Sequence, residues 1–219
     1  MQNLRLAALL LVLIIGFAAP LHAADKPAQL ALWNPVQLLG ADQSITGLRL
    51  SILYGENANL TGVDCGLVNY TGGNQIGLQF GAAGIVKGDA SGLQYGILNI
   101  AGTMSGMQAG LIGISGDFEG AQMAALNFTG TATGLQLGGI NASGDAEGIH
   151  FGGLNFTGTM NGIQIGVINA TGTLEGLQLG LFNATGQAHG LQFGLINRIE
   201  KGGWLPICLI INGSSGKSK

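Results

Sequence analysis

Positively charged residues are missing from the middle of this chain. Lys and Arg number 8 in 219 residues, and none lies between Lys87 and Arg198. The acidic residues in that interval are Asp89, Asp117, Glu119, Asp145, Glu147 and Glu175. A surface that follows a phosphate backbone needs clustered cations. We therefore expect no nucleic-acid partner, and anionic membrane surfaces are unfavourable for the same reason.

Cysteine and histidine are also too few for most catalytic chemistry. The two cysteines, Cys65 and Cys208, lie far apart in the sequence, and a metal site needs more ligands than these two provide. Neither His150 nor His189 shares a Ser–His–Asp arrangement with suitable partners. We expect no cofactor, no metal and no enzymatic activity.

Proline, with 4 residues, is rare, whereas glycine reaches 41 and apolar residues make up 47% of the chain. This combination differs from that of a disordered low-complexity segment, which would lack apolar residues. The glycines follow a fixed period, with three steps of 15 residues and then seven of 14. The glycines that open the eleven units are Gly47, Gly62, Gly77, Gly92, Gly106, Gly120, Gly134, Gly148, Gly162, Gly176 and Gly190. A short fixed period is typical of units that are stable only when stacked on their neighbours.

Each unit has the same internal pattern when its opening glycine is numbered position 1. Apolar residues occupy positions 2, 4, 6, 7, usually 9, and 13, with Gln at position 3 and Asn at position 8. Strand side chains alternate between two faces. If the apolar positions face inward, the alternation changes phase at 6/7 and again at 14/1, which gives two short strands joined by two bends. The pattern thus predicts an all-β fold, a flattened two-sided parallel β-solenoid of 14-residue rungs about 4.8 Å apart.

Stacking in register places equal residues above one another, as in side-chain amide ladders. In this arrangement we expect Gln and Asn, with positions 10, 12 and 14, to face outward, and both cysteines, at position 4, to face inward as free thiols. The residues that we expect to form structural ladders are Gln136, Gln164, Gln178, Asn141, Asn155, Asn169 and Asn183.

Five segments are expected along the chain. Residues 1–23 read as a signal peptide, with Arg5 before an apolar run and small residues before a cleavage site at Ala23. Residues 24–46 form an N-terminal cap in which Trp33 to Leu39 resembles a degenerate unit, and 47–197 form the repeat domain. Residues 198–212 form a C-terminal cap in which Leu205 to Asn212 fits the repeat frame once more, with Asn212 at position 8. Residues 213–219 are expected to be a disordered tail.

The same letters allow an antiparallel up-and-down β-barrel of about 12 strands. Asn-x-Thr-Gly also suits a hairpin turn, and one turn per unit leaves strands of about ten residues, enough to cross a membrane. Three observations favour the solenoid. Aromatic residues, at 6%, form no girdle; all connections are equally short; and positions 7 and 13 would place Ile, Leu and Met in the lumen.

The opening Gly47 to Asn57, the stretch Gly62 to Asn69, the GLQxGLxN units and the closing Gly203 to Pro206 together resemble a bacterial family of exported surface-repeat proteins of the spirochaete type. The resemblance covers nearly the whole mature chain. It implies an exported, envelope-associated protein of a Gram-negative bacterium and no activity.

We therefore expect a non-enzymatic structural or adhesive protein of the periplasm, outer membrane or cell surface. Its partner would be an envelope component or a glycan, and exposed strand edges would permit end-to-end self-association. In the barrel alternative, the chain would be a small outer-membrane pore or anchor.

Overall fold

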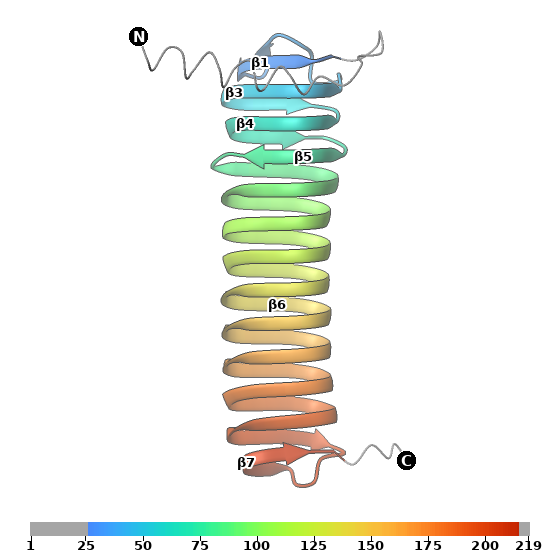
Figure 1. The fold of residues 1–219 in the computed structure, drawn as a ribbon, viewed down its shortest axis with the longest axis vertical. Helices are drawn as coiled ribbons and strands as arrows, with labels where there is room; N and C mark the ends of the chain where they lie inside the picture. The colour runs from blue at the N-terminus through green and yellow to red at the C-terminus, as the bar shows by residue number, and fades with distance from the viewer. Residues whose placement is uncertain (1–25, 215–219) are drawn as a thin grey trace, which may run out of the picture.

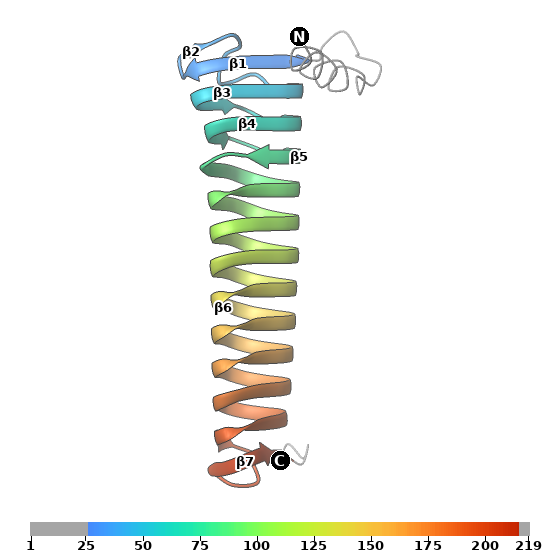
Figure 2. The same ribbon diagram turned by 60° about the vertical axis from the view of Figure 1, so that its left-hand side comes forward.

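The computed structural model describes residues 26–214, which form one long sheet wound into a rod (Figure 1). Its strands are β1 (Ala28–Trp33), β2 (Val36–Gln37), β3 (Ile45–Asn57), β4 (Leu60–Thr71), β5 (Gln75–Phe80), β6 (Ala83–Lys201) and β7 (Ile207–Gly213). Strand β6 has 119 residues because the backbone stays extended through its bends and continues from coil to coil. Figure 2 shows these coils stacked along the axis, with β1 and β2 at one end and β7 at the other. Among the described residues, no helix is long and apolar enough to cross a membrane.

Successive units pair in parallel and in register. Gly47 lies opposite Gly62, Gly62 opposite Gly77, and Gly77 opposite Gly92. The predicted parallel β-solenoid is confirmed. The antiparallel up-and-down alternative is wrong, because each unit forms one coil and Asn-x-Thr-Gly continues the strand instead of making a hairpin turn.

The opening glycine of each rung is required by its backbone conformation. Ten of these glycines, from Gly47 to Gly176, have φ between 120° and 141°, a region that only glycine adopts without strain. A Cβ at Gly162 would also overlap the carbonyl oxygen of Gly148, its equivalent in the preceding rung. Position 1 is therefore a bend at which adjacent backbones are in close contact.

The N-terminal cap differs from its prediction. Residues Ala28 to Ala31, rather than Trp33 to Leu39, form the partial additional rung, and they pair in parallel with Leu48 to Ser51. The chain then reverses at the cis Asn34–Pro35 bond, so that β2 runs antiparallel to β1.

The C-terminal cap also reverses direction. Strand β7 pairs antiparallel with the last rung and places Asn212 opposite Gln192, not at position 8 of another parallel rung. The reversal begins after Gly202, whose φ of 79° is left-handed. The start of the predicted tail is ordered, since Gly213 belongs to β7 and the Ser214 amide donates to the Gly190 carbonyl. The predicted signal peptide and the rest of the tail lie outside the described residues.

Candidate functional site: polar interior and apolar exterior

A column of buried glutamines at position 3 runs through the interior. Where consecutive rungs both carry glutamine, the Nε2 of one donates to the Oε1 of the preceding one, as in Gln136 to Gln122 at 2.7 Å, Gln178 to Gln164 at 2.8 Å and Gln192 to Gln178 at 2.7 Å. These side chains are at most 2% exposed. Position 10, which was expected to face outward, also lies in this interior. There Gln164 donates to Thr157 Oγ1 at 2.9 Å. The interior amides thus bond to one another along the rod axis.

A second buried column consists of the asparagines at position 8. From Asn127 through Asn183, each Nδ2 donates at 2.8 Å to the Oδ1 of the asparagine in the following rung, and Asn197 is the last acceptor. The ladder thus includes Asn141, Asn155, Asn169 and Asn183. Each Nδ2 also donates to the backbone carbonyl of position 4 in that rung, as from Asn155 to Ile165 at 2.9 Å. Every repeated amide therefore ties its rung to the next.

The predicted outward orientation of Gln136, Gln164, Gln178, Asn141, Asn155, Asn169 and Asn183 is wrong, because all seven are buried. An amide carries both a donor and an acceptor, so an in-register stack satisfies its own hydrogen bonds without water. The interior beside these amides is closely packed. A Cβ at Gly166, at position 5, would come within 2.7 Å of Asn155 Nδ2. Of the predicted inward positions, position 13 is confirmed, with Met104, Phe118, Met160 and Leu174 buried.

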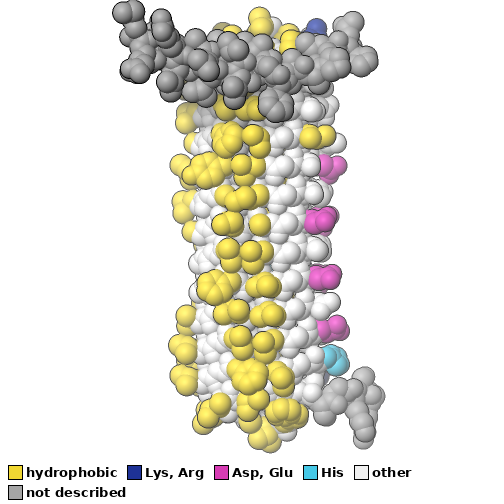
Figure 3. All heavy atoms as spheres, viewed as in Figure 1, with side chains coloured by type: hydrophobic (Ala, Val, Ile, Leu, Met, Phe, Trp, Pro, Cys, Tyr) yellow, Lys and Arg dark blue, Asp and Glu magenta, His cyan; other side chains and the backbone are white. Residues whose placement is uncertain are grey.

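The apolar side chains at positions 2, 4 and 6 face outward instead. We call this surface the broad face. Figure 3 shows apolar side chains in rows along the length of the rod. The exposed side chains of the broad face include Leu50, Tyr95, Met123, Phe151 and Phe193 at position 4 and Ile52, Leu67, Ile97, Leu111, Val167, Leu181 and Leu195 at position 6. With rungs about 4.8 Å apart, this face is roughly 50 Å long. An apolar patch of this size marks an interaction surface.

A second apolar surface follows the bend at 6/7 and carries positions 7, 9 and 11. We call it the narrow face. It contains a cleft of about 670 Å³ whose lining includes Ile114, Phe128, Ala142, Phe156 and Ala170, all at position 9. The hydroxyls beside this cleft, such as those of Thr157 and Thr171, bond to each other at 2.9 Å and to interior amides. The cleft therefore offers mainly carbon to a partner.

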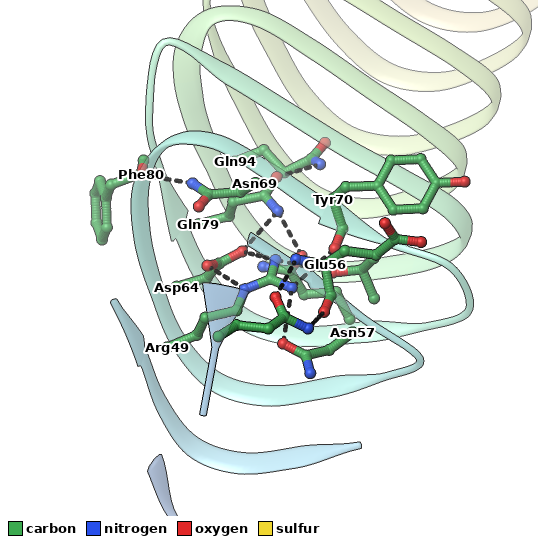
Figure 4. A network of polar contacts seen from close by, with 12 residues as sticks. Arg49, Glu56, Asn57, Asp64, Asn69, Tyr70, Gln79, Phe80 and Gln94 are labelled. Atoms are coloured by element: carbon green, nitrogen blue, oxygen red, sulfur yellow. Dashed lines mark hydrogen bonds and ion pairs between the residues drawn. The ribbon is translucent and has the colours of Figure 1, made fainter. Parts of the chain in front are cut away.

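Buried charges occupy position 3 in the first two rungs (Figure 4). The Arg49 guanidinium donates to both carboxylate oxygens of Asp64, at 2.7 Å and 2.6 Å, and both side chains are 0% exposed. Gln79 Nε2 then donates to Asp64 Oδ2 at 2.9 Å. This ion pair replaces the first amides of the glutamine column and is enclosed by the fold, so we assign it to structure.

His150 interrupts the glutamine column between Gln136 and Gln164. It is 2% exposed, and its Nδ1 has no hydrogen-bond partner. Burial lowers the pKa of His150 to about 4. The outward orientation expected for position 3 is therefore wrong for His150 as well, whereas His189, at position 14, is exposed as predicted.

The remaining candidate groups are dispersed. Cys65 and Cys208 are free and half-exposed rather than buried. For Cys65 the reason is that position 4 faces outward. Glu119, Glu147 and Glu175 are exposed at position 14, as predicted; acidic side chains form a row along one edge in Figure 3. Across residues 26–214, no three His, Cys, Asp or Glu side chains come close enough to hold a metal ion.

Comparisons with protein-family models, with curated proteins and with solved structures found no match. Functional inference therefore depends on the two outward apolar faces. Sequence reasoning missed these faces because period-two alternation defines two sides without saying which is buried. The repeats do contain an indication that positions 3 and 8 are buried. Position 8 is never charged, and the charges at position 3, Arg49 and Asp64, have opposite sign in consecutive units.

Proposed function

We propose that this chain is an exported, non-enzymatic structural or adhesive protein of the bacterial envelope, which binds an envelope component through its broad face. The observation that carries the proposal is the inverted arrangement of polarity, in which amides fill the interior and aliphatic and aromatic side chains cover the surface. The expected signal peptide and the resemblance to exported surface-repeat proteins support the location.

The broad face favours an uncharged, apolar partner surface. Positions 2, 4 and 6 carry no charged residue from Leu48 to Leu195, so binding would desolvate no ion. Hydrophobic attachment is strengthened, not weakened, by high concentrations of excluded salts such as sulfate. Retention in such a wash distinguishes it from attachment by charge.

The proposal can be tested by expressing the full chain in a Gram-negative host and separating envelope from soluble fractions after a sulfate wash. The test variant is the triple substitution Phe151→Glu, Val167→Glu and Leu181→Glu on the broad face. We expect the wild type to remain with the envelope and the variant to be released, because the lost apolar contacts are together worth at least about 2 kcal/mol.

The matched control places three glutamates on the exposed polar edge, as Thr131→Glu, Thr159→Glu and Asn161→Glu. This control adds the same charge and should fractionate like the wild type. Far-UV circular dichroism of each purified protein establishes that the β-solenoid is retained. A wild type found wholly in the soluble fraction, or a control released as completely as the broad-face variant, would refute the proposal.

A further inference from the structure

The narrow face is shaped by a column of glycine beside a column of bulky apolar residues. Its position 11 is glycine in every rung from Gly102 to Gly186, which lowers one side and opens the cleft. Its position 7 is continuously Leu, Ile or Phe from Leu98 to Ile196. Between these columns, position 9 changes strongly in size from rung to rung. The surface is therefore shaped along its length as well as across it.

The order of sizes at position 9 is complementary to its own reverse. The column contains Ile114, Phe128, Ala142, Phe156, Ala170 and Ala184 in sequence. If a second column runs in the opposite direction, Ile114 faces Ala184, Phe128 faces Ala170, and Ala142 faces Phe156. At position 9, each large side chain therefore meets a small one in all six rungs, which is the pattern by which facing side chains interdigitate.

We propose that the partner of the narrow face is a second copy of this chain, packed antiparallel about a two-fold axis between the rungs of Ala142 and Phe156. A two-fold axis that lies in the contact plane and is perpendicular to the rod reverses the order of the rungs in the second copy. Each column of one copy then still faces the same column of the other copy. The contact is isologous, so one surface serves both copies and the assembly closes at two. The broad face remains free, and the inference does not depend on the proposed function.

The size and charge of the face suit such a dimer. Eight rungs from Leu98 to Ile196 give a contact of roughly 35 Å by 16 Å, which buries on the order of 1,100 Å² over both copies at sheet spacings. This value lies at the low end of specific interfaces. Positions 7, 9 and 11 carry no charge from Leu98 to Gly186. In the last of the eight rungs, Arg198 and Glu200 lie at positions 9 and 11 and pair with each other at 3.0 Å. Charge is therefore confined to the two ends of the contact, where it forms neutral pairs. A lipid surface would need no such matching of sizes, which is why we favour a second copy.

The test is sedimentation of residues 24–219 over a range of concentrations, without detergent. Ala170→Phe places Phe against Phe128 of the other copy at two symmetric sites. Overpacking at both sites should raise the dimer dissociation constant at least about ten-fold. Phe128→Ala leaves facing alanines and should also weaken the dimer, through two cavities.

The decisive variant combines Phe128→Ala with Ala170→Phe. The large side chain then faces the small one again, with the same composition as the wild type, and the dissociation constant should return to within about three-fold of the wild-type value. The matched control is Ala121→Phe on the broad face, which adds the same apolar group and should leave the dimer unchanged. Phe already occurs at position 9, so the substitutions are compatible with the rung.

A monomeric wild type at every concentration would overturn the proposal. So would an Ala170→Phe variant that associates as tightly as the wild type, because nonspecific apolar adhesion gains from an added ring. Failure of the double variant to recover would exclude the antiparallel register. Tighter binding of Ala170→Phe to phosphatidylcholine vesicles, with undiminished self-association, would identify the narrow face as a lipid-binding surface and overturn the dimer.

Discussion

His150 makes the stability of the rod dependent on pH. Its imidazole lies at position 3, between the neutral amides of Gln136 and Gln164, and Glu147, at position 14 of the preceding rung, is exposed at the outer edge. No carboxylate is bonded to it, and burial lowers its pKa from 6.5 to about 4. The folded chain therefore resists binding a proton that the unfolded chain binds readily.

The direction of the effect follows from proton linkage. Above about pH 7.5, both states carry a neutral His150, and this residue adds no pH dependence. As the pH falls through 6.5, the unfolded state takes up a proton and gains stability relative to the folded state. The loss continues until the folded state also binds the proton near pH 4. The separation of the two pKa values corresponds to a loss of about 3 kcal/mol of unfolding free energy.

The assay compares denaturant midpoints of the wild type and His150→Gln at pH 8 and pH 4. Glutamine continues the interior column and does not titrate, so the variant lacks this contribution while it retains all other ionisable groups. We expect the variant to be more stable at both values, by a margin that widens by about 3 kcal/mol at pH 4. Parallel pH profiles for the two proteins would refute the reasoning, because they would show that His150 has the same proton affinity in both states.

Two further predictions concern the bends and the buried charges. Gly162→Ala should destabilise the rod by several kcal/mol, since φ is 141° and a Cβ would overlap the Gly148 carbonyl. The control is Gly153→Ala, where φ is not positive. Equal melting temperatures for the two variants would contradict the prediction. Arg49→Met should cost about 3–5 kcal/mol of stability by leaving Asp64 buried without its partner. The double substitution Arg49→Gln and Asp64→Gln should recover much of this stability, because it extends the amide column. Thermal melts followed by circular dichroism measure both variants, and a single variant as stable as the double would refute this account.

The fold was predictable because the repeat constrains it in two independent ways. The fixed spacing of glycines from Gly47 to Gly190 implies one coil per unit, and identical residues in every coil favour stacking in register. The bend at position 6/7 was also predictable, since two adjacent apolar residues break the alternation. The caps were less predictable. The reversals after Trp33 and Gly202 depend on local turns that occur once and have no repeat to define them.

The prediction of which side chains in each rung face inward was wrong for most positions, for a physical reason. The expectation that apolar side chains are buried holds when the interior has room for them and polar groups have no other partners. In this rod, a Cβ at Gly166 would already approach Asn155, so the interior is narrow. The amide stacks supply every rung with partners from the next rung, which removes the usual cost of burying them.

This inversion separates the side chains that maintain the fold from those that meet a partner. The buried columns are nearly uniform, as Asn127 to Asn197 show, because each member must match the hydrogen bonds of its neighbours. The outward columns have no such requirement, so Phe128 and Ala142 can alternate in consecutive rungs without disturbing the coil. The sizes of the outward side chains can therefore vary from rung to rung while the interior stays constant. Variation on the narrow face, rather than in the ladders, is where we infer that the specificity of association lies.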